Sequence, residues 1–286
     1  MTTIGIIGGT GLYALDGLTQ VREIKVDTPF GAPSDVLVTG KLGGAQLVFL
    51  PRHGRGHRLS PTEVPYRANV FAMKSLGAEW LVSVSSVGSM REDLHPGDMV
   101  MVDQYLDRTR LRAESFFGDG IVAHVSMAHP VCPRLANHLA AAGRATGAAV
   151  HDGGTLVCIE GPAFSTLAES LAYRAQGVDV IGMTAMPEAK LAREAELHYA
   201  TVAMVTDYDC WHESEGHVTV DAVLAMLKKN GATAKKMLEH ALSTVGSIAG
   251  TCGCATALKA ALQTDKAAVP QERIDDLRPL VGKYYA

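Results

Sequence analysis

Hydrophobic and polar positions along the 286-residue chain form two kinds of segment. Short β-branched apolar runs have the length of buried strands, and small, polar or aromatic turns follow several of them. Between these runs lie segments whose apolar positions repeat with the helical period. This alternation predicts an α/β fold with a largely parallel sheet. The predicted strands cover residues 3–7, 21–26, 35–39, 46–50, 79–84, 98–102, 154–159, 178–182 and 201–206.

The helical segments predict the layers that flank this sheet. Residues 103–120 are polar around a pair of phenylalanines and predict a long loop. No repeat or linker interrupts the chain, so we expect one domain over residues 1–249, with residues 250–286 as its C-terminal helical extension. The predicted helices cover residues 63–76, 133–146, 167–176, 187–196 and 220–248, the last interrupted near Gly231, with further possible helices at 258–262 and 270–281.

Composition and charge narrow the class of protein. Hydrophobic residues make up 47% of the chain and charged residues 20%, and the net charge of −4 does not suggest a nucleic-acid-binding surface. No run is long and apolar enough to cross a bilayer, and the start of the chain lacks the basic region of a signal peptide. Five scattered cysteines do not form a secreted disulfide framework. We therefore expect a cytoplasmic enzyme.

Two carboxylates directly follow the most apolar strand candidate. Asp207 and Asp209 come after the run 201–206 and are flanked by Tyr208 and Trp211. An open α/β sheet places its ligand at this end of its strands, where core packing does not require an acid. A single aspartate here is more often a cap for the next segment. Two aspartates beside aromatic rings favour a binding site.

Other strand candidates also end in chemically distinctive turns. The turn around Thr10 is rich in glycine and can approach an anion, but it lacks the G-x-G-x-x-G spacing of a dinucleotide loop. Arg52 and His53 open a cationic stretch that suits anions better than metals, and a solvated basic loop is the alternative. Phe164 stacks on a flat ligand or folds into the core, with even odds.

We expect these strand ends to meet at one edge of the sheet, because parallel strands place their carboxyl ends together. Sorted by chemistry, they form two groups, which together suggest a nucleoside and a phosphate. The donors that suit phosphate are Thr10, Arg52, His53, Ser85 and Thr184, and the groups that suit a nitrogen-rich base are Phe164, Met183, Asp207 and Asp209.

Seven motifs in the same order resemble a known family. The motifs are IGIIGGTGL, DTPFG-x-PSD, RHGRGH, GSMRE, IEGPAFST, MPEA and TDYDCW, and the resemblance runs from about residue 4 to about residue 248. Together they resemble the methylthioadenosine phosphorylase family, within the trimeric purine nucleoside phosphorylases. The resemblance implies one α/β domain around a mixed, partly barrel-like sheet. It also implies a homotrimer, or a dimer of trimers.

The resemblance further implies a role for each matching residue. Thr10, Arg52, His53, Ser85 and Thr184 match phosphate-binding positions. Met183 matches the residue beneath the ribose, and Ser86 is among the substrate-binding positions. The base-binding positions are matched by Phe164, Ser165, Asp207 and Asp209. Val220 and Val223 match the apolar wall around the methylthio group, and His124 matches a residue that the neighbouring subunit contributes.

The implied reaction is phosphorolysis of S-methyl-5′-thioadenosine to adenine and 5-methylthioribose 1-phosphate. Asp207 is then the general acid that protonates the leaving base. Phosphate is a co-substrate, and neither a metal nor an organic cofactor is required. Two acceptors for a 6-amino group argue for adenine, whereas members specific for 6-oxopurines usually carry asparagine at this position.

Some positions depart from the family pattern. Ala163 stands where arginine is frequent, Ser85 and Ser86 replace a Thr-Ala pair, and Gly182 replaces asparagine. Adenosine, methylthioadenosine and methylthioinosine therefore remain open as substrates. The rival functions are a 6-oxopurine nucleoside phosphorylase, an NAD-dependent oxidoreductase that uses residues 8–11, and a non-catalytic nucleoside-binding protein.

Cys252 and Cys254 form a C-x-C pair that the proposed reaction does not use. The pair has three interpretations: a redox-sensitive couple, a metal clip completed by His212 and His217, or two free thiols. Free thiols are favoured in the reducing cytosol.

Overall fold

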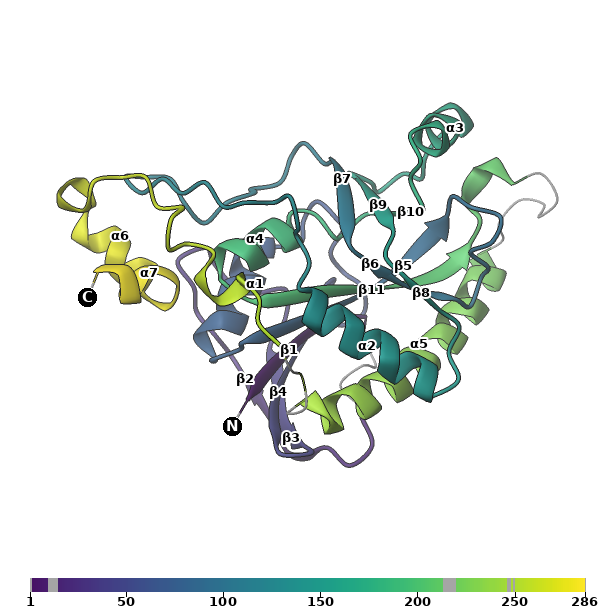
Figure 1. Ribbon diagram of the computed structural model, residues 1–286, viewed down its shortest axis with the longest axis horizontal. Coiled ribbons are helices and arrows are strands. Elements are labelled where there is room, and N and C mark those ends of the chain that lie inside the picture. The colour runs from purple at the N-terminus through teal and green to yellow at the C-terminus, as the bar shows by residue number, and fades with distance from the viewer. Residues whose placement is uncertain (1, 10–14, 213–219, 246–247, 249, 286) are drawn as a thin grey trace.

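A mixed sheet of eleven strands forms the centre of the protein (Figure 1). The computed structural model describes residues 2–9, 15–212, 220–245, 248 and 250–285, and only the backbone of 220–224. Most predicted strands are present, with ends shifted by a few residues. The strands are β1 (Thr3–Gly8), β2 (Thr19–Ile24), β3 (Leu37–Leu42), β4 (Ala45–Pro51), β5 (Trp80–Ser89), β6 (Met99–Val102), β7 (Gln104–Arg108), β8 (Val150–Asp152), β9 (Thr155–Ile159), β10 (Val180–Gly182) and β11 (His198–Asp207).

Helices cover the two faces of the sheet in two layers. One apolar core joins α1, α4 and α7 to the face that carries Ile7. The other joins α2 and α5 to the face that carries Ile4 and Ile6, as the alternation of side chains along a strand requires. The helices are α1 (Tyr66–Ser75), α2 (Pro133–Ala145), α3 (Leu167–Ala175), α4 (Glu188–Glu194), α5 (Val220–Ser243), α6 (Gln271–Asp276) and α7 (Arg278–Tyr285).

The strand β5 connects the two halves of the sheet. It pairs with the parallel strand β11 along almost its whole length. On its other edge it pairs first with parallel β1, as far as Ser83, and then with antiparallel β10, from Gly88 onward. Among the described residues, positions 84–87 of β5 therefore have no strand partner on that edge. We call this interval the β5 gap.

The prediction that parallel strands bring all the carboxyl ends to one edge of the sheet is wrong for part of the sheet. The strand β10 runs opposite to β5, and β9 and β7 run with β10. The carboxyl ends of β1 and β4 thus approach the β5 gap from one direction, and those of β9 and β10 approach it from the other. The strand ends still converge, but on the middle of β5 rather than along one edge of the sheet.

Four local predictions are corrected by the structure. The turn expected at residues 85–89 is a continuation of β5, because β11 hydrogen-bonds along it. The long loop 103–120 begins with β7, and β8 was not anticipated. The helix α5 is continuous through Gly231, which has open space around it. Residues 258–262 form turns rather than a helix.

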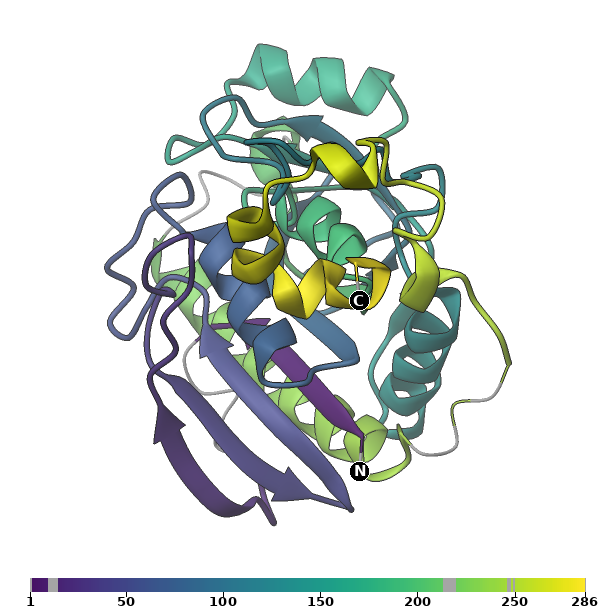
Figure 2. The same cartoon turned by 90° about the vertical axis from the view of Figure 1, so that its left-hand side faces the viewer.

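The C-terminal residues pack on the main body through a long arm, residues 109–132. Figures 1 and 2 show α6 and α7 beside this arm. Ala123 pairs with Leu262, and the Gln263 N–H donates to Val122 O at 2.8 Å. Leu280 and Val281 of α7 join the core around α1. The division into residues 1–249 and an extension at 250–286 stays a prediction. In the described part of the chain, no helix combines the length and apolar character needed to span a membrane.

Candidate active site

The β5 gap exposes two hydroxyl side chains in an otherwise buried strand. Ser85 and Ser86 are half-buried, whereas the rest of β5 is buried. The structure thus opens the sheet at the residues that the sequence assigned to phosphate and substrate. Gly182, the last residue of β10, lies against this gap, because a side chain there would meet Val87 and Ser86 O.

Arg52 reaches the gap from the end of β4 and is almost fully buried. Its Nε and Nη2 donate to the two carboxylate oxygens of Glu188 at 2.9 and 3.1 Å. Its Nη1 donates to Val84 O at 3.1 Å, inside the gap. Further bonds from Nη2 reach Ile7 O and Ser83 Oγ. One of the two Nη1 hydrogens is left without an acceptor among the described residues.

His53 is held as a neutral imidazole. Its Nδ1 lies 2.9 Å from Leu59 O, a carbonyl that can only accept a hydrogen bond, so Nδ1 carries the proton. The ring stacks on His57 with centroids 4.3 Å apart. Burial, and then the charge of Arg52, lower the pKa of His53 to about 4. The Nε2 atom is therefore an acceptor at neutral pH.

The buried side chain of Arg112 fixes the segment that follows β10. The sequence did not predict this role. Arg112 donates through Nη1 to Met183 O and Met186 O at 2.7 and 2.6 Å, and through Nη2 to Glu160 O at 2.7 Å. Thr184 lies buried within this clamped segment. Arg112 comes from the long arm, and nothing in its local sequence distinguishes it from an exposed arginine.

Glu160 completes this clamp. It accepts a hydrogen bond from Arg112 Nε at 3.0 Å and another from Thr62 Oγ1 at 2.6 Å. Burial works to raise the pKa of Glu160, but its hydrogen bonds from Thr62, the arm backbone and Arg112 outweigh it and lower the pKa to about 2. The ionised carboxylate therefore ties the arm to the end of β9.

Asp207 and Asp209 lie together beside Gly88. A side chain at Gly88 would meet Asp207 Oδ1 at 3.0 Å and Asp209 Cβ at 3.3 Å. Asp207 accepts bonds from Thr206 Oγ1 at 2.7 Å and from the Asp209 N–H at 2.9 Å. Ser170 Oγ donates to Asp209 Oδ2 at 2.6 Å. Glycine is therefore required at position 88 to leave room for both acids.

Asp209 holds its proton more readily than an ordinary aspartate. Burial raises the pKa of Asp209, and the neighbouring Asp207 carboxylate adds to the rise against the hydrogen bond from Ser170. Its backbone is left-handed, with φ of 53°. This conformation turns the chain sharply after β11 and keeps the second acid close to the first.

The segment before α3 carries an exposed aromatic ring and a buried hydroxyl that lacks a hydrogen-bond partner among the described residues. Phe164 is 83% exposed, so the alternative that it folds into the core is wrong. Ser165 Oγ is buried and has no hydrogen-bond partner among the described residues. Because buried polar atoms are nearly always paired, such an atom indicates a partner that binds from outside the chain.

The side chains assigned to phosphate and those assigned to the base contact one continuous stretch of β5. Arg52 bonds to Val84, and Asp207 pairs with Gly88. Four residues of extended strand span about 13 Å. This is the scale of a nucleoside with phosphate at its sugar carbon, so the two groups can serve one substrate pair.

One predicted site residue, His124, lies on the arm, away from the β5 gap of its own chain, and others lie outside the described residues. His124 is exposed on the arm, where its backbone N–H donates to Ala261 O at 2.9 Å. Thr10 lies outside the described residues, as do the side chains of Val220 and Val223.

Comparison with known proteins gives consistent matches along the chain. The model of the Phosphorylase superfamily matches residues 3–243. The S-methyl-5′-thioadenosine phosphorylase of Geobacter sulfurreducens is 57% identical, and the match covers 98% of each chain. A methylthioadenosine phosphorylase from an antarctic soil metagenomic library has a similar structure, with a TM-score of 0.93, 50% identity and 98% coverage of each chain. The Schistosoma mansoni methylthioadenosine phosphorylase in complex with adenine gives a TM-score of 0.85 at 39% identity, covering 92% of this chain and 99% of that one.

Proposed function

The chain belongs to the phosphorylase superfamily, and from this premise we propose that it cleaves S-methyl-5′-thioadenosine with phosphate. The products are adenine and 5-methylthioribose 1-phosphate, which makes the protein a pentosyltransferase of purine and methionine salvage. The observation that carries this proposal is the β5 gap: hydroxyl and cationic groups lie at it, a pair of acids lies at its far end, and about 13 Å of extended strand separates Val84 from Gly88.

Phosphate binds at the β1 end of the gap. Ser85 and Thr184 supply hydroxyl donors, and Thr10 completes the set. Arg52 offers its remaining Nη1 hydrogen while Glu188 fixes the guanidinium in place. Since Glu188 offsets much of the arginine charge, we expect hydroxyl and backbone donors to carry a large share of phosphate binding. The neutral His53 accepts through Nε2 from a phosphate or sugar hydroxyl.

Adenine binds at the β10 end of the gap. Asp207 and Asp209 accept from the base, Ser165 Oγ gains the partner it lacks, and Phe164 covers the ring. Met183 lies under the ribose with Ser86 nearby. The sequence resemblance, rather than the structure, assigns Val220 and Val223 to the methylthio pocket. His124 reaches the same pocket of a neighbouring subunit.

The reaction is a substitution at C1′ without redox change. A phosphate oxygen forms a bond to C1′ while the bond from C1′ to N9 breaks, and the electron pair moves into the purine. Asp207 delivers a proton to N7, which neutralises the leaving base. A pair of close acids can share one proton at neutral pH. With these bond changes and this proton transfer the reaction is complete, and it requires neither a metal nor an organic cofactor.

A second candidate is a phosphorylase for 6-oxopurine nucleosides or methylthioinosine. It is favoured only by the departures at Ala163, Ser85 and Gly182. The acid pair works against it, because a 6-oxo group presents an acceptor where Asp207 and Asp209 are also acceptors. An unpaired buried acceptor reduces turnover by several orders of magnitude.

We further propose a cytoplasmic homotrimer. Phe164, Leu167 and Leu171 are 83%, 53% and 48% exposed; Phe164 precedes α3, and the two leucines lie within this helix, which projects from the main body (Figure 1). Exposed apolar groups of this kind are typical of subunit contacts. Light scattering coupled to gel filtration is expected to give three times the monomer mass, or six times for a dimer of trimers. A monomer at micromolar concentration contradicts this assembly.

The reaction is tested by following phosphate-dependent adenine release. Methylthioadenosine, adenosine, methylthioinosine and inosine are compared at equal concentration, with and without phosphate. We expect the highest kcat/KM for methylthioadenosine and no release without phosphate. Preference for inosine supports the second candidate, and binding without any turnover contradicts an enzymatic role.

A further inference from the structure

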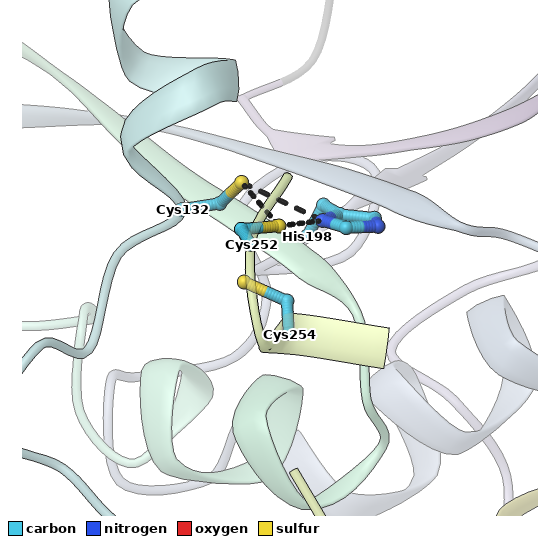
Figure 3. A group of neighbouring side chains, drawn as sticks. All are labelled: Cys132, His198, Cys252 and Cys254. Atoms are coloured by element: carbon cyan, nitrogen blue, oxygen red, sulfur yellow. Dashed lines mark hydrogen bonds between the residues drawn. The ribbon is translucent and has the colours of Figure 1, made fainter. Parts of the chain in front are cut away.

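Three thiols and one imidazole meet at the end of the sheet opposite the acid pair (Figure 3). Cys132 immediately precedes α2, His198 opens β11, and Cys252 and Cys254 come from the C-terminal segment. The three sulfur atoms and one ring nitrogen lie within 4.8 Å of one another. The proposed phosphorolysis uses none of these four residues.

The spacing of these atoms fits a tetrahedral metal site. A zinc ion with Zn–S bonds of about 2.3 Å and a Zn–N bond of about 2.0 Å requires S···S edges of about 3.8 Å and S···N edges of about 3.5 Å. Cys132 Sγ lies 3.8 Å from Cys252 Sγ and 3.5 Å from His198 Nδ1. Cys252 Sγ lies 3.2 Å from the same nitrogen.

The surroundings fix the imidazole and supply positive charge. The ring of His198 stacks on Trp80, with centroids 4.2 Å apart, which holds Nδ1 towards the sulfurs. Arg193 Nη1 lies 3.7 Å from Cys254 Sγ. Arg193 has no carboxylate within ion-pair distance among the described residues, and its buried Nε has no hydrogen-bond partner there. A half-buried cation of this kind suits an anionic neighbour.

We propose that Cys132, His198, Cys252 and Cys254 bind one structural zinc ion. Three thiols and a neutral imidazole bind Zn²⁺ with the release of three protons, which leaves a centre of net charge −1 beside Arg193. Sulfur and imidazole ligands favour zinc over magnesium or calcium. Four protein ligands leave no open position, so the ion has a structural role and does not activate water.

This proposal replaces the clip with His212 and His217 considered for the C-x-C pair. His212 stacks on Tyr208 and lies 3.2 Å from Glu92, and His217 is outside the described residues. The zinc ion instead ties the C-terminal segment to β11 and to the start of α2. The same segment packs on the arm that carries His124, so the ion also stabilises the base of that arm.

Metal content and geometry can be measured on the whole protein. Protein purified under reducing conditions, without added metal or chelator, is analysed by mass spectrometry for zinc. Zinc is then removed with a chelator and replaced with Co²⁺. We expect about one zinc per chain, and for cobalt the intense visible bands of a tetrahedral site with a thiolate-to-metal band in the near ultraviolet.

Variants identify the ligands. Cys254→Ser and Cys252→Ser are each expected to reduce zinc to below about one fifth of an equivalent and to abolish the tetrahedral cobalt bands. Cys210→Ser, which removes a thiol outside the cluster, is the matched control and is expected to keep the metal. His198→Cys is expected to retain zinc through four thiolates, whereas His198→Ala is expected to lose it. A histidine needed only for packing on Trp80 would not show this rescue.

The wild-type measurements keep the proposal testable even if a variant fails to fold. Chelation is expected to lower the Tm by about 5 °C or more, and added Zn²⁺ is expected to restore it. Wild-type protein that contains no zinc, and that takes up cobalt without tetrahedral bands, overturns the proposal. A disulfide between Cys132 and Cys252 in protein kept under reducing conditions, seen as the loss of two hydrogens in the intact mass, also overturns it.

Discussion

The two ends of β11 carry two different kinds of site. At the carboxyl end, Asp207 lies beside Gly88 of β5, next to the gap where Ser85 and Ser86 are half-buried. At the amino end, His198 joins cysteines from two separate parts of the chain, Cys132 and the pair Cys252 and Cys254. The first site is open to a ligand, whereas the second is closed by its own side chains. In the two proposals above, one strand thus carries a catalytic acid at one end and a metal ligand at the other.

The distance between these ends separates their effects. A ten-residue strand is roughly 30 Å long, and β11 is buried along most of its length. Changes at sites this far apart, with no shared partner, usually have additive effects. We therefore expect substitutions at the acid pair to alter turnover without metal content, and substitutions at the cysteine cluster to alter stability more than the chemical step.

The largest expected effect tests the acid end. Asp207→Asn is expected to lower kcat/KM for methylthioadenosine by about 10² to 10⁴, because it removes the proton donor to the base. Turnover of inosine relative to adenosine is expected to rise, since an amide can donate to a 6-oxo group. Steady-state kinetics with both nucleosides measure this.

Asp152→Asn is the matched control for that substitution. Asp152 is 63% exposed on β8, and among the described residues its one ion pair is with the exposed Arg144, so its loss is expected to leave kinetics unchanged. Zinc content is expected to be the same in both variants. An unchanged base preference in Asp207→Asn would remove Asp207 from its assigned role.

The next effect concerns stability at the phosphate end of the site. Glu188→Gln leaves the buried guanidinium of Arg52 without its counter-charge, which is expected to cost about 3 to 5 kcal/mol. For a chain of this size this corresponds to a fall in Tm of roughly 10 °C. The double variant Arg52→Met with Glu188→Leu is expected to recover part of the loss. A Glu188→Gln protein as stable as wild type would contradict a buried ion pair.

A smaller effect concerns pH. The pKa of His53 is about 4 in the folded protein, below the value near 6.5 of an unfolded histidine. The unfolded state therefore takes up a proton first, and the stabilising contribution of this residue falls as the pH drops from about 6.5 to 4. Because the ring is partly exposed, we expect a loss on the order of 1 to 2 kcal/mol. Denaturant unfolding of His53→Gln between these pH values is expected to show a weaker dependence than wild type.

The smallest expected effect concerns Ser165, whose buried hydroxyl has no hydrogen-bond partner among the described residues. Ser165→Ala is expected to raise KM for the nucleoside up to about tenfold, the worth of one hydrogen bond, with little change in Tm. Ser75→Ala, at the end of α1, is the control, because Ser75 Oγ already donates to Phe71 O. If both variants keep wild-type KM, Ser165 does not contact the base.

Sequence predicted the acid end much better than the cysteine end. The strands that carry Arg52 and Asp207 have strong local patterns, and distinctive side chains directly follow them. The reversed direction of β10 could not be read, because strand pairing is non-local. Glu188 and Arg112 were missed for the same reason: their partners lie 136 residues from Glu188 and up to 74 residues from Arg112. Cys132 and His198 carry no local motif at all.

The β5 gap has a consequence for how the two halves of the sheet behave. Since β11 supports β5 from the other side, the sheet can leave positions 84–87 uncovered without coming apart. In the proposed function, phosphate and nucleoside occupy the place of a missing strand and act as a wedge between β1 and β10. The joint should stiffen when both are present, so amide hydrogen exchange at Ser85 and Ser86 should slow with the loaded enzyme and recover once the products leave.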